Sequence, residues 1–222
     1  MRTILLPLLV SFGIGACARL DDVPLRRTAE GTLEAVPTWK SISEKNVVMQ
    51  GFDYSCGAAA MATLLKHYFG SPVTEAEILR DVLAHLDKKT FEKRKEDGLS
   101  LLDLKEYAER HGYQAVGVRL KPDALLKLKG PILIYLETPE FRHFAILRGV
   151  REDRVYVADP ARGNVRQPVD RFLNEWSGLA LVLGKPGFGT PQDTALALDL
   201  DVPVRPELQA ARRALYFSSR GI

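Results

Sequence analysis

The sequence has few of the residues that hold small disulfide-rich or zinc-bound proteins together. Its 222 residues include two cysteines and four histidines. Two cysteines cannot form a disulfide scaffold, and this set does not favour a four-ligand structural zinc site. Positive charge is in small surplus, because 31 Lys and Arg stand against 28 Asp and Glu with no long basic block. Nucleic acid is therefore not an expected partner.

Long hydrophobic runs are also scarce. The run at the N-terminus, Ile4–Ile14, has eleven residues and is interrupted only by Pro7, Ser11 and Gly13. At about 1.5 Å per residue it covers about half of a bilayer core, which is too short for a membrane-spanning helix. Preceded by Arg2, the run is typical of a secretory signal peptide.

Two cleavage patterns overlap at the end of this run. Residues 14–17 (IGAC) resemble a lipobox, in which Cys17 becomes the lipidated first residue, and residues 16–18 (ACA) also fit ordinary signal peptidase. We favour the first pattern. The sequence thus predicts a signal peptide over 1–17 and an exported, periplasmic protein, attached to the outer membrane only if Cys17 carries lipid. Cys56 then remains as a single thiol, which is either inert in the core or a nucleophile.

The remaining composition is that of a globular protein, at 46% hydrophobic and 27% charged residues. Disorder, collagen and coiled coil are excluded on these values. Residues 18–45 lack periodicity and are predicted to be a tether, and residues 46–186 to form one domain. Residues 187–222, rich in Gly, Pro and Thr, are predicted to be a C-terminal extension with a short helix at 205–215.

The predicted elements change in type along the domain. Three helices are expected. The first covers 56–69, the second begins at a capping box at 74–77 and ends near residue 86, and the third runs from Ser100 to about His111. The charged segment between the second and third, 87–98, is expected to be a mobile loop. Short apolar or alternating runs after Gly112 predict strands. Helices followed by a mostly antiparallel sheet indicate an α+β fold. The strands are expected at 113–120, 131–136, 143–150, 154–158 and 179–183, with a hairpin connection at 150–154.

Cys56 stands directly before the strongest helix pattern. Free N–H groups and the helix dipole favour a thiolate there, and the small residues Gly57 and 58–60 would leave room for a substrate backbone. The alternative is a small cysteine buried under a helix. Gln50 lies six residues earlier, where its amide could share an oxyanion with the Cys56 N–H, or could simply lie on the surface.

His143 begins a strand and Asp159 ends the next one, sixteen residues later. The hairpin between them would bring the carboxylate to the imidazole, where it could fix the ring tautomer. The alternatives are a structural histidine and a turn-forming Asp-Pro pair. Three mixed ligands at Cys56, His143 and Asp159 do not favour a metal site, and no cofactor is predicted.

With these residues, the sequence resembles the papain-like cysteine peptidases that process bacteriocin leaders after a double glycine. The resemblance covers about residues 47–184 and rests on residues 50–57 (QGFDYSCG), 143–145 (HFA) and 159–161 (DPA). It implies a papain-like fold, with the N-terminal helices packed on a mostly antiparallel sheet. It also implies the site roles: Cys56 as nucleophile, His143 as general base and acid, Asp159 as its orienting partner and Gln50 as oxyanion donor.

The sequence departs from this family in two respects. Ser55 stands where many members have Asp, and the chain has neither a transmembrane bundle nor a phosphate-binding loop. It is more similar to stand-alone exported relatives, including those of bacterial functional-amyloid (Fap) secretion systems. The resemblance implies hydrolysis of a secreted polypeptide, either a double-glycine leader or an amyloid-export substrate, and an export-system component as a second partner.

Two other functions are consistent with the same residues. An escort module would hold an exported polypeptide in the periplasm without cutting it, and its thiol would react only slowly with electrophiles. An amidase or acyl transferase would use the same chemistry on cell-wall peptides. The charged segment 87–98 is expected to be a solvated surface, although it could gate or dock a substrate.

Overall fold

The computed structural model describes residues 25–138 and 141–198. The predicted signal peptide and the predicted helix at 205–215 lie outside the described residues. The chain divides after Trp39 into two units. The described part of the first unit, within the range predicted as a tether, contains an antiparallel hairpin of β1 (Leu25–Arg27) and β2 (Leu33–Ala35).

The second unit is built on a six-stranded antiparallel sheet with the strand order β3-β8-β4-β5-β6-β7. Five of its strands match predicted strands within one or two residues, and β7 was not predicted because its sequence is polar. The strands are β3 (Gln114–Arg119), β4 (Ile132–Glu137), β5 (Arg142–Arg151), β6 (Arg154–Asp159), β7 (Gly163–Pro168) and β8 (Leu179–Gly184).

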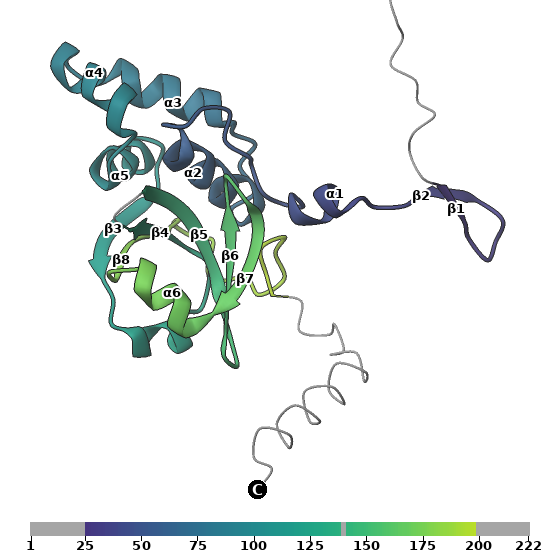
Figure 1. Cartoon of the computed structure of the whole chain (residues 1–222). Coiled ribbons are helices and arrows are strands. Elements are labelled where there is room, and N and C mark those ends of the chain that lie inside the picture. The colour runs from purple at the N-terminus through teal and green to yellow at the C-terminus, as the bar shows by residue number, and fades with distance from the viewer. Residues whose placement is uncertain (1–24, 139–140, 199–222) are drawn as a thin grey trace, which may run out of the picture. The chain divides into compact units, whose positions relative to one another are not determined.

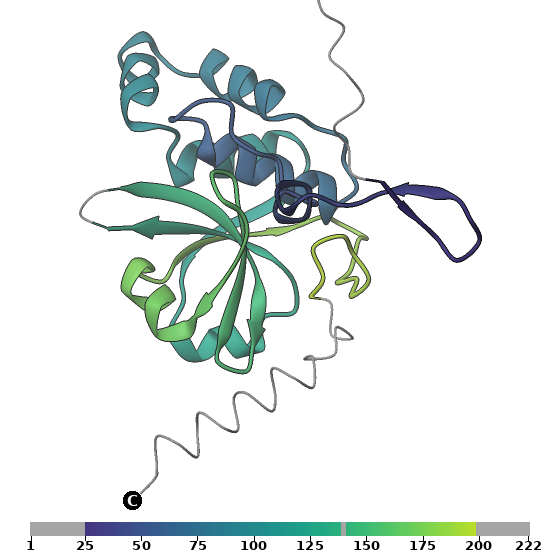
Figure 2. The ribbon, with the colours of Figure 1, turned by 45° about the vertical axis from the view of Figure 1, so that its right-hand side comes forward.

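Helices cover both faces of this sheet, as Figures 1 and 2 show. Helices α2 to α5 lie together on one face, and α6 with the 3₁₀ helix η2 lies on the other. This arrangement confirms the predicted α+β class. The helices are α1 (Trp39–Ser43), α2 (Cys56–His67), α3 (Glu75–Ala84), α4 (Lys88–Asp97), α5 (Leu101–Arg110), η2 (Pro122–Lys127) and α6 (Val169–Glu175).

Helix α2 is the central element of the helical layer. Its residues from Cys56 to Leu65 are all buried, which its Ala-rich sequence allows because small side chains let neighbouring elements approach closely. A Cβ atom added at Gly57 would lie 3.1 Å from Cδ2 of Phe144 and 3.2 Å from Cδ1 of Leu104. The small residues therefore serve helix–sheet packing, and the expectation that they leave room for a substrate was wrong.

The segment 87–98 is helical, so the predicted mobile loop was wrong. The side chain of Asp87 caps α4 by accepting hydrogen bonds from the N–H groups of Lys89 and Thr90. Gly98 ends it with φ of 78°, where an added Cβ would meet the carbonyl oxygen of Tyr54 at 3.2 Å. The helix has no buried residue, so its sequence lacks the apolar period by which a helix is recognised.

Both predicted capping boxes are present. Thr74 with Glu77 caps α3, and Ser100 with Asp103 caps α5. Asp103 also accepts a hydrogen bond from the Arg94 guanidinium and thereby joins α4 to α5. Among the described residues, no helix is both long and apolar enough to cross a bilayer.

Residues 187–198, which composition assigned to the extension, pack on the domain. Leu196 is buried in the core on the helical side of the sheet. The guanidinium of Arg148 on β5 donates to the carbonyl oxygens of Leu196 and Ala197 at 3.0 and 2.7 Å. The folded unit therefore continues past residue 186.

Candidate active site

Cys56 is the first residue of α2 and is 7% exposed. The hydroxyl of Ser55, directly before it, accepts from the N–H of Phe52 and donates to the carbonyl oxygen of Phe52. This bonding fixes the turn that leads into the helix. Because the Ser55 hydroxyl is bonded to the backbone of Phe52, it caps none of the N–H groups of α2. The thiol thus lies at the positive end of a buried helix.

The β5–β6 hairpin brings His143 and Asp159 together, as the sequence predicted. Nε2 of His143 lies 2.9 Å from Oδ1 of Asp159, and the side chain of Asp159 is fully buried. The same carboxylate oxygen accepts from the N–H groups of Ala161 and Arg162, at 2.8 and 3.1 Å. Oδ2 accepts from Nε of Arg162 at 2.7 Å. The buried carboxylate therefore has donors on both oxygens, and its orientation is fixed.

The side chain of Cys56 lies near enough to the imidazole of His143 to raise its pKa. Since Nε2 faces Asp159, Nδ1 is the ring nitrogen left for the sulfur. Burial lowers the pKa of His143, but its hydrogen bonds to Asp159 and Cys56 and their charges raise it by more, to about 9. Burial raises the pKa of Asp159, but hydrogen bonding and charge from His143 and Arg162 lower it to about 2. At neutral pH the carboxylate is ionised and the ring holds a proton.

Gln50 is joined to this cluster through its backbone, since its N–H donates to the carbonyl oxygen of Pro160 at 2.9 Å. Its side-chain Nε2 donates to the carbonyl oxygen of Phe52, and its Oε1 is buried without a hydrogen-bond partner. A buried amide oxygen without a partner is unusual in a folded protein.

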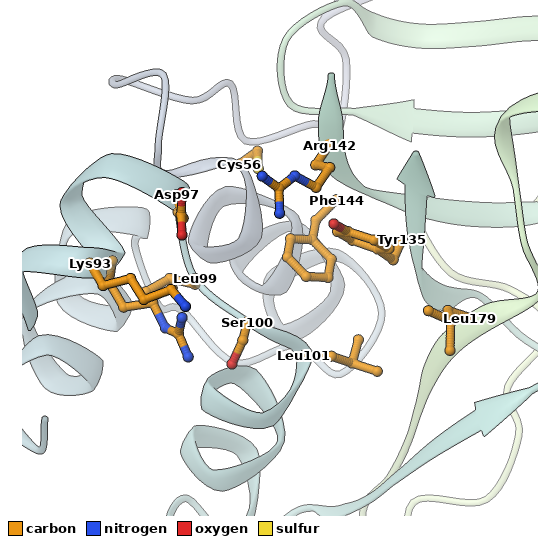
Figure 3. A pocket seen from close by; sticks show the side chains of 12 residues that line it. Cys56, Lys93, Asp97, Leu99, Ser100, Leu101, Tyr135, Arg142, Phe144 and Leu179 are labelled. Carbon is orange, nitrogen blue, oxygen red and sulfur yellow. The ribbon is translucent and has the colours of Figure 1, made fainter. Parts of the chain in front are cut away.

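A cavity of about 310 Å³ opens beside Cys56, between the helical layer and the sheet (Figure 3). Lys93 and Asp97 of α4 lie on one side of it, and Tyr135, Phe144 and Leu179 lie on the strands opposite. The lining is mostly apolar, with charged side chains added at its margin. Its residues are Cys56, Lys93, Arg94, Asp97, Gly98, Leu99, Ser100, Leu101, Tyr135, Arg142, Phe144 and Leu179.

The sequence did not reveal this cavity or the role of Arg162 as a partner of Asp159. The cavity forms from α4, α5 and three strands, which no local pattern relates to one another. Arg162 could have been noticed, because it lies three residues after Asp159 in the turn that the Asp-Pro pair predicts. Two further histidines lie outside this cluster, and the rings of His85 and His111 both bond to Asp81.

Comparison with known proteins gives consistent matches. The Peptidase C39 family matches residues 44–186. The probable functional amyloid protease FapD of Pseudomonas aeruginosa is 31% identical over 92% of this chain and 93% of its own length. The FapD of Pseudomonas fluorescens is 36% identical over 74% of this chain and 70% of its own. A crystal structure of a double-glycine-motif protease from an AMS/PCAT transporter, in complex with the leader peptide, is 29% identical with a TM-score of 0.52. It covers 62% of this chain and 89% of the other.

Proposed function

Because the chain belongs to the Peptidase C39 family and is a cysteine peptidase, we propose that it cleaves a secreted polypeptide with a Cys56–His143–Asp159 triad. The observation that carries the proposal is the position of the His143 ring, which is hydrogen-bonded to Asp159 and lies near enough to Cys56 for the thiol to raise its pKa. A nucleophile, a base bonded to it and a group that orients the base form the arrangement required for covalent hydrolysis.

The proposed reaction proceeds through a thioester. The Cys56 thiolate attacks the scissile carbonyl carbon, and the carbonyl π electrons move to oxygen. The proton on His143 passes to the leaving amine as the C–N bond breaks. His143 then takes a proton from water, whose oxygen attacks the thioester and releases the acid and the thiolate. Throughout, Asp159 holds the ring with Nδ1 towards sulfur.

Gln50 is the proposed oxyanion donor, together with the N–H of Cys56. This role is supported by the backbone hydrogen bond from Gln50 to Pro160, which holds Gln50 beside the residue that follows Asp159. Gln50→Ala should lower kcat about 100- to 1,000-fold, because one preorganised donor to the oxyanion is lost. Steady-state kinetics on a cleaved peptide measure this effect.

The control for Gln50→Ala is the rate at which iodoacetamide alkylates Cys56. Alkylation forms no oxyanion, so this rate should match that of the unmodified protein. An unchanged kcat in Gln50→Ala would remove Gln50 from the mechanism. A loss of alkylation as well would mean that the substitution had disturbed the turn before Cys56.

A polypeptide substrate is supported by the cavity beside Cys56 and by the relatives. The cavity has an apolar lining of the kind that accepts side chains, and the FapD proteins are named as amyloid proteases. The transporter protease was crystallised with a leader peptide. The proposed substrate is accordingly an exported polypeptide, with either a double-glycine leader or an amyloid-export segment, and an export-system component is a proposed second partner.

The location and domain division also belong to the proposal. Residues 1–17 would direct export to the periplasm, with Cys17 as a lipid anchor to the outer membrane. A tether over 18–45 would join that anchor to the peptidase domain at 46–186, followed by the extension at 187–222. The packing of residues 187–198 adds that the extension begins as part of the folded unit.

The test is to incubate the protein with unfolded exported polypeptides, including double-glycine leader peptides, and separately with murein fragments, and to identify products by mass spectrometry. We expect new peptide termini in the polypeptide samples. These termini should not form when Cys56 has first been alkylated with iodoacetamide. An escort module would bind the polypeptides and release them intact, and products from murein alone would favour an amidase. Either of these outcomes would contradict the proposed function.

A further inference from the structure

Arg162 has a position that the triad does not account for. The N–H groups of Ala161 and Arg162 already hold Oδ1 of Asp159, so the turn is closed by backbone bonds alone. The side chain of Arg162 nevertheless returns to the same carboxylate and donates from Nε to Oδ2 at 2.7 Å. It is 41% exposed, whereas Asp159 is fully buried. A side chain that is not needed to close the turn thus bonds to the second oxygen of this buried carboxylate.

We propose, on the basis of the proposed function, that Arg162 is a positioning residue of the hydrolytic site. Its guanidinium holds Oδ2 of Asp159 so that Oδ1 faces the ring of His143, and its charge limits how strongly His143 retains a proton.

The positioning follows from which atoms are bonded. A carboxylate held at one oxygen can still rotate about the bond to Cβ, and such a rotation would move Oδ1 away from Nε2 of His143. A charge-assisted bond from Arg162 to the other oxygen opposes this rotation. Because catalysis depends on small displacements of reacting groups, an Asp159 held at Oδ1 alone would let the ring move relative to Cys56.

The electrostatic effect follows from the order of the charges. Asp159 lies between two cationic groups, His143 when protonated and Arg162. Each cation competes for the same negative charge, so Arg162 weakens the attraction of Asp159 for the proton on His143. In the mechanism that proton must leave for the substrate amine, and a ring that held it too strongly would be a poorer acid.

Other titratable and charged side chains lie on the elements around this cluster. Cys56 is a further titratable group that acts on the His143 ring. Arg142, which precedes His143 on β5, lines the cavity together with Tyr135. The loop packed against Gly163 carries Glu44, which pairs with Lys40 at 3.9 Å. Arg162 is therefore the cation whose removal changes the charge balance on Asp159 directly.

Gly163 fixes the course of the chain after Arg162. It has φ of 78°, and a Cβ atom there would come within 2.4 Å of the carbonyl oxygen of Ser43. Substitutions at Arg162 leave this constraint and the backbone donors to Oδ1 in place. A change of the side chain alone can therefore be tested without reshaping the turn.

The test is the titration of the His143 ring by NMR in the Cys56→Ala background, where no catalysis is needed. His143→Gln in that background identifies the signal. Arg162→Gln should raise the pKa of His143 by about one unit, because a positive charge near Asp159 is lost. Arg162→Lys should restore most of the original value. Arg166→Gln, an exposed arginine stacked on Tyr156 in the same hairpin, is the matched control and should change nothing.

In the protein with Cys56 intact, Arg162→Gln should lower kcat about tenfold with KM nearly unchanged. It should also move the basic limb of the pH–rate profile to higher pH. A pKa of His143 that falls towards 6.5 in Arg162→Gln would show that the side chain only maintains the turn, and would overturn the proposal. An unchanged pKa or an unchanged kcat would overturn it as well. If no Cys56-dependent cleavage is found, the proposed function fails. That outcome is distinguishable from failure of the Arg162 proposal, because the NMR titration does not require cleavage.

Discussion

Replacing Cys56 by alanine should lower kcat/KM for peptide cleavage by about 10⁶-fold, the loss seen when a triad nucleophile is removed from a protease. The physical reason is that no other group in the cluster can form the thioester: the His143 ring is a proton carrier and Asp159 is buried behind it. Quantitative mass spectrometry of product peptides against time measures the rate. A Cys56→Ala variant that keeps more than about a thousandth of the original kcat/KM would contradict the mechanism.

Loss of activity in Cys56→Ala must be separated from loss of fold. The change removes a single buried sulfur atom at the first residue of α2, so the thermal unfolding midpoint should fall by only a few degrees. Cys56→Ser preserves the shape more closely and should be similarly inactive, because a hydroxyl is far less ionised than a thiol beside the same ring. His67→Gln, a histidine on the same helix outside the cluster, should retain full activity.

Replacing His143 by alanine should have a loss of similar size, about 10⁶-fold in kcat/KM. In the proposed mechanism the ring performs both proton transfers, so neither the leaving amine nor the attacking water has a proton partner in the variant. Steady-state kinetics on the same cleaved peptide measure the loss. A variant that keeps more than about a thousandth of the original kcat/KM would contradict the role of His143.

The same ring sets the pH dependence of the unmodified protein. The pKa of His143 is raised to about 9, so the ring keeps its proton below that value and loses it above. The pKa of Asp159 is lowered to about 2, so this carboxylate stays ionised at neutral and alkaline pH. We expect kcat/KM to fall as pH rises through about 9, where the leaving amine no longer finds a proton donor. A profile that is flat from pH 8 to 11 would contradict this assignment.

The sequence predicted the elements that have strong local signals. The Ala-rich run after Cys56, the capping boxes at Thr74 and Ser100, and the alternation around His143 each follow from chemistry within a few residues. These signals gave the α+β class and the resemblance to the peptidase family, which the family match over residues 44–186 confirms. The order Gln50, Cys56, His143, Asp159 was visible for the same reason.

Elements with weak local signals were missed. Helix α4 was predicted as a loop because it buries none of its residues and has no apolar period. Strand β7 is polar because it lies at the edge of the sheet, and it forms through its pairing with β6. The small residues after Cys56 were assigned to substrate access, although they allow α2 to approach Phe144 and Leu104. In each case the deciding contact lies outside the element itself.

The sequence alone thus determined the helices and strands that have strong local signals, since helix caps, apolar periods and turn residues act over a few positions. Only the tertiary structure decided which side chains meet. The approach of Cys56 to the His143 ring and the cavity between α4 and the sheet both depend on how separate elements pack. That packing balances many weak contacts between distant segments, and no pattern within a single segment records it.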